Sequence, residues 1–317
     1  MDDRVEQTDF KLGIVNLNPV GNQLLGARGN KLYRVLESNG SIEPVHTFAD
    51  RINAIHVASS GLYVATDKDH KNPGTPCRLY KSTDGGASFT VVWENTNSSL
   101  LWWSITSDQF GNIYIGEYGP KSPGMSKTVW KSTNGGGSWD PVFTAPDREG
   151  LHIHRVAVDP YTNDVWVTTG DGKENRGIYR SKDSGKSWNR ILDSQATSIA
   201  FTPEFVYLGE DHVKNGRVSR YDRNNGHYDE IFNASDYGNY GGSIYDLAVG
   251  TNGSLYIPTM KYPDDTHIAS LWAGHDDEWK LLLRLKSEIG KGSGFKTITG
   301  PDPDGWLYVR GFKIKDR

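Results

Sequence analysis

The chain has 317 residues, a formal net charge of −4 and one cysteine, and 36 of its residues are glycine. The glycine content exceeds the roughly 7% of average proteins, and aromatic residues are also numerous, with 10 Trp, 16 Tyr and 10 Phe. This composition favours many short strands joined by tight turns. A single cysteine excludes an internal disulfide. No apolar run approaches the roughly 18 residues of a membrane span. The balanced charge gives no excess of basic residues for binding nucleic acid.

The chain begins with the acidic, polar stretch MDDRVEQTDF. This start predicts no signal peptide in the sequence as written. Localisation stays open on this basis, extracellular if a leader has been removed and cytoplasmic otherwise.

Short segments rich in β-branched and aromatic residues recur along the chain and predict strands. A first, weaker set is expected at Leu12–Val15, Leu24–Ala27, Leu32–Val35 and Ile42–Thr47. Six inner strands follow at Ile52–Ala58, Trp103–Ser107, His154–Val158, Ser198–Phe201, Tyr245–Val249 and Phe295–Ile298. Each is succeeded by a second strand, at Leu62–Thr66, Ile113–Glu117, Val165–Thr169, Val206–Glu210, Leu255–Thr259 and Leu307–Gly311.

A ten-residue pattern repeats between the later strands of three units, at Tyr80–Phe89, Trp130–Trp139 and Tyr179–Trp188. It reads aromatic, basic, Ser, any, Asp or Asn, any, Gly, any, Ser, aromatic. The Asp or Asn side chain is expected to accept hydrogen bonds from its own turn, and the glycine to adopt positive φ. The closing aromatic is expected to fill the seam between neighbouring sheets. Less exact copies of the pattern lie at Ser219–Tyr228 and Trp272–Trp279.

These repeats predict units of four antiparallel strands arranged radially, which avoids long exposed sheet edges. We expect an all-β, seven-bladed β-propeller, with six blades as the alternative, forming one domain over residues 1–317. The last unit stops after Lys313–Arg317, so an N-terminal strand near Arg4–Phe10 is expected to close the ring. Asp276–Ile289 has features of a helix, but the register favours a strand at Trp279–Leu285.

The three turns resemble the Asp-box, or BNR, repeat. That repeat occurs in sialidases, some glycoside hydrolases, propeller polysaccharide lyases and the sortilin ectodomain, and also in a photosystem assembly factor. The resemblance implies a propeller fold and a structural role for the turn residues, Ser82, Asp84, Ser132, Asn134, Ser181 and Asp183. The sialidase Arg-Ile-Pro segment is missing, since Arg51-Ile52-Asn53 is only a distant likeness.

In a propeller, the starts of inner strands and the ends of second strands meet on the face opposite these turns, where loops usually carry function. The residues at those places are polar, aromatic and of mixed charge. The proposed catalytic set is His154, Tyr118, Tyr245 and Glu117. The proposed substrate-binding set is Arg155, Arg28, Arg310, Lys261, Trp103, Asn53, Glu210 and Asp246.

The stretch Leu151–Arg155 carries two histidines. With period two, His152 and His154 share one face of the strand and Arg155 points the other way. The pair could bind a metal, act in acid/base chemistry, or pack as neutral rings, and His56 and His212 are the candidate third ligands for a metal. No cofactor is assigned, although a structural or substrate-bridging divalent cation stays open.

Two chemistries fit this face. In β-elimination from a uronic-acid glycan, a cation neutralises the carboxylate while His or Tyr removes the α-proton, as the resemblance to propeller lyases also implies. In hydrolysis two carboxylates face each other across the glycosidic bond, and Glu117, Glu210, Asp246 and Asp171 are the candidates. Trp103 rather than Trp102 is expected to stack on sugar.

The sequence therefore predicts a carbohydrate-active propeller that cleaves an anionic polysaccharide, with elimination preferred to hydrolysis. A non-catalytic glycan- or protein-binding propeller is the alternative from another class. A poly- or oligosaccharide is the expected partner, and we expect a monomer that binds neither nucleic acid nor membrane.

Overall fold

The computed structural model describes residues 18–20, 23–36, 41–69, 72, 74–119, 127–146, 151–171, 173–210, 216–237, 242–261, 268–275, 278–286, 293–301 and 305–312. In these segments the protein is built from strands, and the one helical element is a 3-10 turn at Ala234–Tyr237. Among the residues described, no helix has the length and apolar character needed to cross a membrane. The chain divides into two compact units between Ala196 and Thr197.

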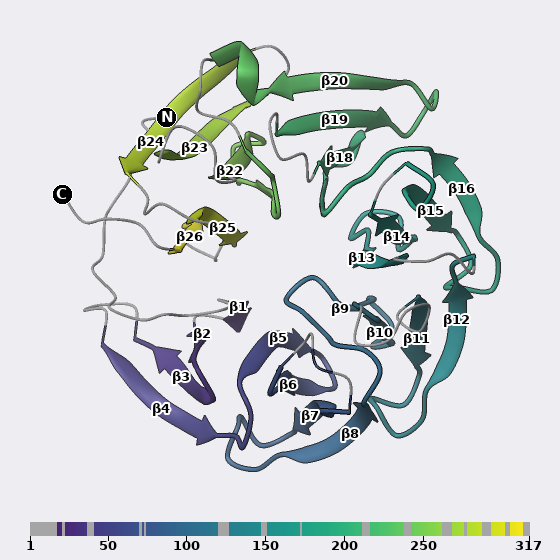
Figure 1. Cartoon of the computed structure of the whole chain (residues 1–317), viewed down its shortest axis with the longest axis vertical. Coiled ribbons are helices and arrows are strands. Elements are labelled where there is room, and N and C mark those ends of the chain that lie inside the picture. Colours follow the sequence, from purple (N-terminus) through teal and green to yellow (C-terminus); the bar gives the residue numbers. More distant parts are fainter. Residues whose placement is uncertain are drawn as a thin grey trace. The chain divides into compact units, whose positions relative to one another are not determined.

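The unit that ends at Ala196 contains four antiparallel sheets in which the strands lie in chain order (Figure 1). The first sheet consists of β1 (Asn18–Val20), β2 (Gln23–Arg28), β3 (Lys31–Val35) and β4 (Ile42–Thr47). The second consists of β5 (Ile52–Ala58), β6 (Gly61–Asp67), β7 (Cys77–Ser82) and β8 (Thr90–Asn95). The third consists of β9 (Ile105–Ser107), β10 (Ile113–Gly116), β11 (Thr128–Ser132) and β12 (Asp140–Thr144). The fourth consists of β13 (His152–Val158), β14 (Val165–Gly170), β15 (Gly177–Ser181) and β16 (Asn189–Leu192).

The other unit repeats this plan. One of its sheets consists of β17 (Ser198–Phe201), β18 (Phe205–Gly209), β19 (Arg217–Asp222) and β20 (Tyr228–Asn233). The next consists of β21 (Ala248–Val249), β22 (Leu255–Lys261), β23 (Ile268–His275) and β24 (Glu278–Lys286). Two more strands, β25 (Ser293–Thr299) and β26 (Tyr308–Phe312), pair with each other, and β25 also pairs with the end of β22.

The prediction of seven blades is wrong, and the alternative of six blades is confirmed. Six sheets are present in the described part of the chain, as in the six-blade alternative. Five of them have four strands, and the sixth consists of β21–β24 with the β25–β26 pair attached to β22. The predicted strands at Leu12–Val15 and near Arg4–Phe10 lie outside the described residues, and so does Lys313–Arg317, where the last predicted unit stops. The prediction of a strand rather than a helix at Trp279–Leu285 is confirmed by β24.

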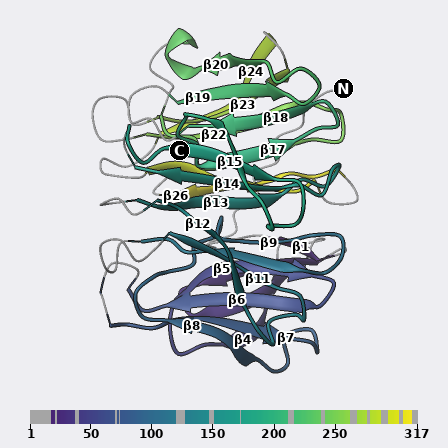
Figure 2. The same ribbon diagram turned by 90° about the vertical axis from the view of Figure 1, so that its right-hand side faces the viewer.

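The apolar core lies between consecutive sheets. Leu79 and Ala65 of the second sheet pack with Ile113 and Ile115 of the third, and all four side chains are buried. Figure 2 shows from the side how β5, β6, β7 and β8 run next to one another in such a sheet. Because a single antiparallel sheet cannot bury both of its faces, each sheet depends on its neighbours for burial.

The three repeated turns form the same hydrogen-bond arrangement. In the last of them, Asp183 accepts from the backbone N–H of Ser187 at 2.8 Å and from the Ser187 hydroxyl at 2.5 Å. The Ser181 hydroxyl in turn accepts from the N–H of Gly185 at 2.8 Å. Gly185 has φ of 93°, so the predicted positive φ and the predicted side-chain acceptor are both confirmed.

The closing tryptophan of a turn binds the outer strand of the preceding sheet. The indole N–H of Trp139 donates to the Val92 carbonyl at 2.8 Å, and that of Trp188 donates to the Val142 carbonyl at 2.7 Å. In the other unit Trp279 donates in the same way to the Ile231 carbonyl at 2.9 Å. The prediction that these aromatics fill the seam between sheets is confirmed.

Removing one such indole donor should weaken the seam. In Trp188→Phe the Val142 carbonyl loses its partner, and we expect the free energy of unfolding to fall by about 1–2 kcal/mol. Urea denaturation followed by circular dichroism measures this. Phe110→Leu, at a side chain that is 71% exposed in the same unit, is the control, and an unchanged midpoint for Trp188→Phe would contradict the prediction.

The charge of Asp183 should make the turn sensitive to acid. Hydrogen bonds from Ser187 lower the pKa of Asp183 from 3.8 to about 2, so its stabilising contribution is complete above pH 4 and is lost as the pH falls toward 2. Asn134 occupies the same place in another turn and accepts from the Ser138 N–H at 2.9 Å. Asp183→Asn should therefore fold normally at pH 7 and lose less melting temperature than the parent between pH 4 and pH 2. Parallel melting curves of the two proteins would contradict this.

Candidate functional site

Two histidine rings meet on the first strand of the fourth sheet, β13. His152 lies opposite Gly170 and Ile153 opposite Thr169, but Arg155 lies opposite Thr168, so His154 is the extra residue of a β-bulge. The ring centroids of His152 and His154 are 4.8 Å apart, so the two rings lie next to each other. Bulges redirect side chains at functional sites, and period-two alternation did not predict this one.

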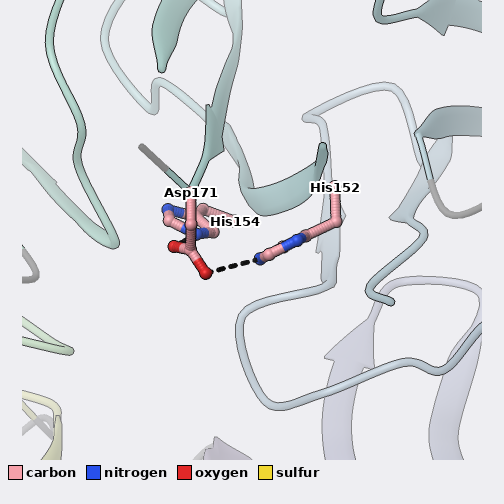
Figure 3. Close-up of side chains that lie close together, drawn as sticks. All are labelled: His152, His154 and Asp171. Carbon is pink, nitrogen blue, oxygen red and sulfur yellow. Dashed lines mark hydrogen bonds and ion pairs between the residues drawn. The ribbon is translucent and has the colours of Figure 1, made fainter. Parts of the chain in front are cut away.

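His154 is held at both ring nitrogens. Its Nε2 lies 3.0 Å from Oδ1 of Asp171, and its Nδ1 lies 3.3 Å from the carbonyl oxygen of Ala196. Both partners are acceptors, so only the doubly protonated ring donates to both, whereas a neutral ring with its proton on Nδ1 directs the Nε2 lone pair toward Asp171. Figure 3 shows Asp171 lying against His154, with the His152 ring turned toward the same carboxylate.

Gly170 provides the space that His154 occupies. A Cβ atom added to Gly170 would lie 2.6 Å from Nε2 of His154 and 2.9 Å from Nδ1. A ring whose two nitrogens are both engaged cannot move aside without losing a hydrogen bond. Gly170 is therefore required for the position of the imidazole.

Tyr118, from the loop after β10 of the third sheet, packs edge-to-face against His152 with 4.7 Å between ring centroids. The Ile153 N–H donates to the Glu117 carbonyl at 3.2 Å, and this backbone bond joins the two sheets beside both rings. The ring centroid of Trp103 lies 5.6 Å from that of Tyr118 and 4.1 Å from that of Trp102. A continuous series of aromatic rings, Tyr118, Trp103 and Trp102, thus extends from the histidine pair along the third sheet.

Exposure differs sharply within this cluster. The side chains of His152 and His154 are 6% and 3% exposed, whereas that of Asp171 is 65% exposed. The hydrogen bond from His154 lowers the pKa of Asp171, which keeps its carboxylate ionised at neutral pH. The site therefore presents a negative charge to solvent above two buried imidazoles.

Glu117 is buried and engaged within the protein. Its Oε1 accepts from the Asn95 amide at 2.9 Å and from the Ser98 hydroxyl at 3.1 Å, while burial raises its pKa. These contacts fit a residue that stabilises the loop before β9 better than one that donates a proton to a polymer.

The remaining predicted residues of this unit lie at the expected strand ends. Arg28 is exposed at the end of β2, Arg155 is half-buried on β13, and Asn53 is buried at a β-bulge of β5 equivalent to that of His154. His56, one candidate third metal ligand, is 2.9 Å from the Ser107 hydroxyl, and burial lowers its pKa to about 4. His212, the other candidate, lies outside the described residues.

Five predicted residues belong to the unit that follows Ala196. Asp246 is buried and accepts from the Ile298 N–H at 3.2 Å, and Tyr245 beside it is half-buried. Glu210 follows β18, Lys261 ends β22, and Arg310 lies opposite Thr297 in the β25–β26 pair. The candidate site is accordingly built from residues of the first unit, and the roles assigned to these five remain predictions.

Sequence reasoning missed Gly170, the Ala196 carbonyl and Gln195, whose amide N–H donates to Asp171 at 3.3 Å. No local pattern marks them, because their importance comes from their distance to a ring on another strand. Asp171 was recognised only as a hydrolytic carboxylate, although its position after the second strand of the sheet was a usable signal.

No protein-family model matches this sequence, and no curated protein matches it. Solved structures do. An ancestral GH74 enzyme matches with a TM-score of 0.63 and 18% identity over 87% of this chain and 39% of that chain. The extracellular domain of a hybrid two-component system from B. thetaiotaomicron matches with a TM-score of 0.62 and 14% identity over 95% of this chain and 37% of that one. A nidogen/laminin complex matches with a TM-score of 0.54 and 13% identity, covering 83% of this chain and 92% of that chain.

These similarities identify the fold. The protein is an all-β β-propeller with six blades of four-stranded antiparallel sheets. It spans less than half of the GH74 enzyme and of the two-component system domain. At such low identity the similarity defines the class of fold and leaves the activity to the site.

The spatial requirement at Gly170 is directly testable. Gly170→Ala should displace His154 and lower the free energy of unfolding by about 1–3 kcal/mol, as overpacking does. Gly137→Ala is the control, since the atoms nearest to a Cβ there belong to the exposed side chain of Asn134 and lie at 3.1 Å or more. Thermal melting and the NMR signals of the histidine rings report the two effects, and a variant with unchanged melting and ring signals would refute the requirement.

Proposed function

We propose that this propeller acts on carbohydrate and cleaves an anionic, uronic-acid-containing polysaccharide by β-elimination. The observation that carries the proposal is the cluster of Tyr118, His152, His154 and Asp171 on two adjoining blades. The fold shared with a glycoside hydrolase of the GH74 class supports a carbohydrate-related role.

The reaction needs one group to take a proton and one to give a proton. The C5–H bond of the uronate breaks, its electron pair forms the C4–C5 double bond, and the C4–O4 bond breaks as the leaving oxygen is protonated. Tyr118 is half-buried and so within reach of a bound sugar, whereas the histidines beneath it are buried. We assign both transfers to Tyr118, whose phenolate would take the C5 proton and then give it to the leaving oxygen, and assign to His152 the positioning of the Tyr118 ring.

The carboxylate of a uronate also requires neutralisation, which lowers the barrier to removing its α-proton. Asp171 has the wrong sign for this task, because it adds negative charge at the entrance. Arg28 and Arg155 are the cations that we propose from the same unit. A cation bound by Asp171 itself would reverse the sign locally.

An aromatic platform fits the same ligand class. Trp103 is 6% exposed, so little of its surface is left for a sugar. Trp102 packs against it and is half-buried. The proposed stacking role is therefore moved from Trp103 to Trp102, where a pyranose C–H face can contact indole.

Hydrolysis is the second candidate. Asp171 is an exposed, ionised carboxylate, and a glycoside hydrolase is among the structural neighbours. A hydrolytic mechanism needs two carboxylates that face each other across the glycosidic bond, and Asp171 would supply one of them.

Product chemistry tests the proposal. The purified chain is incubated with polygalacturonate, alginate and hyaluronan, and near-ultraviolet absorbance of the new C4–C5 double bond is followed over time. We expect this absorbance to rise, and we expect Tyr118→Phe to lower the rate at least about 100-fold without changing the melting temperature. Tyr161→Phe, at a 54% exposed side chain in the same unit, is the matched control.

Each other outcome has a defined meaning. Release of reducing sugar without the absorbance would establish hydrolysis and refute elimination. Glycan binding without either signal would establish the non-catalytic alternative. A fully active Tyr118→Phe variant would refute the assignment of proton transfer to Tyr118.

A further inference from the structure

Three side chains of metal-ligating type converge in the fourth blade. The Nε2 of His154 is 3.0 Å from Oδ1 of Asp171, and the Nε2 of His152 is 4.0 Å from Oδ2 of the same carboxylate. One ligand atom from each of the three residues lies within 4.8 Å of the others. In a tetrahedral zinc site, bonds of about 2.1 Å separate the ligand atoms by about 3.4 Å, so small rotations of the His152 and Asp171 side chains bring all three ligand atoms to bonding distance.

The surroundings of His154 are those of a metal ligand. A ligating histidine usually donates its other ring N–H to a carbonyl or carboxylate, which fixes the tautomer. Nδ1 of His154 lies 3.3 Å from the Ala196 carbonyl, so Nε2 is left to face Asp171 with its lone pair. A metal ion between Nε2 and Asp171 would take the place of the proton that otherwise joins them.

Local structure holds the three ligands in this arrangement. The β-bulge at His154 and the absence of a side chain at Gly170 give the ring one position. Among the described residues, Asp171 contacts His154, His152 and Gln195 and forms no ion pair with Lys or Arg. Its negative charge is thus available to a cation that the two imidazoles also bind.

We propose that His152, His154 and Asp171 bind one divalent transition-metal ion, for which Zn²⁺ is the probe. Two imidazoles and one carboxylate suit this class of ion, whereas Ca²⁺ and Mg²⁺ prefer oxygen ligands throughout. Three protein ligands leave a coordination position, and because Asp171 is 65% exposed that position is open to water or to an oxygen of a ligand. The inference stands on geometry alone and does not depend on the proposed elimination.

If both proposals hold, the ion would also compensate the negative charge of Asp171, which otherwise opposes binding of an anionic substrate. It would replace the net negative charge of Asp171 with a positive one next to Tyr118 and so attract a substrate carboxylate. This connection makes metal dependence of cleavage an additional observation, but metal binding is measured without any substrate.

The test uses the full chain, stripped with chelator, dialysed, and titrated at pH 7.5 with Zn²⁺ in a calorimeter. We expect one Zn²⁺ per chain, weaker binding of Ca²⁺, and visible absorption bands of a low-symmetry site when Co²⁺ is used. Asp171→Ala should lower Zn²⁺ affinity by more than about tenfold. The matched control is Asp193→Ala, which removes a similarly exposed aspartate, 62% exposed, from the same unit.

A second pair of variants tests the histidines. His152→Gln should also lower Zn²⁺ affinity more than tenfold, while His56→Gln, which alters the histidine bonded to Ser107, should leave it unchanged. Unaltered Zn²⁺ binding in Asp171→Ala, no Zn²⁺ binding by the parent chain, or a preference for Ca²⁺ would each overturn the proposal. Elimination by a chain that binds no Zn²⁺ would overturn the metal site alone, and Zn²⁺ binding by a chain that cleaves no polymer would overturn the proposed function alone.

Discussion

The seam between consecutive blades is the contact on which the rest of this structure depends. A four-stranded sheet has two faces to bury and an outer strand whose carbonyls need partners. Here the turn of one blade both packs against the preceding blade and donates a hydrogen bond to a carbonyl of its outer strand. Trp188 donates its indole N–H to Val142, and a Cβ at Gly185 would already lie 3.0 Å from the Val142 side chain. The glycine therefore serves the packing between blades as well as the turn.

The same close contact between blades creates the candidate site. Tyr118 and His152 belong to different sheets, and a backbone hydrogen bond from Ile153 to Glu117 holds the two strand ends together next to their rings. The cluster is thus positioned by main chain rather than by long side chains. His152 and His154 lie on the strand β13, and groups placed on rigid elements keep their geometry better than groups on loops.

Charge is the feature of the site that most limits its chemistry. Two buried imidazoles lie under an exposed carboxylate whose pKa is lowered by the histidine that it contacts. The metal ion that we propose between Nε2 of His154 and Asp171 would compensate that carboxylate. The charge presented to an anionic polymer would then depend on whether the ion is bound, which links the proposed metal site to the proposed reaction.

The sequence alone determined the repeating unit, the turns and most strand positions, because the side-chain period and turn chemistry are local properties. It also identified His152 and His154 as neighbours, since they lie two residues apart on one strand. It overestimated the number of blades, because strand signals do not reveal which strands pair: β25 and β26 read like a further unit but form only a strand pair joined to β22. Only the tertiary structure brought Asp171, the Ala196 carbonyl and Gly170 to His154. Their function depends on distances across strands and on a β-bulge, and the spacing of residues along a chain does not encode either.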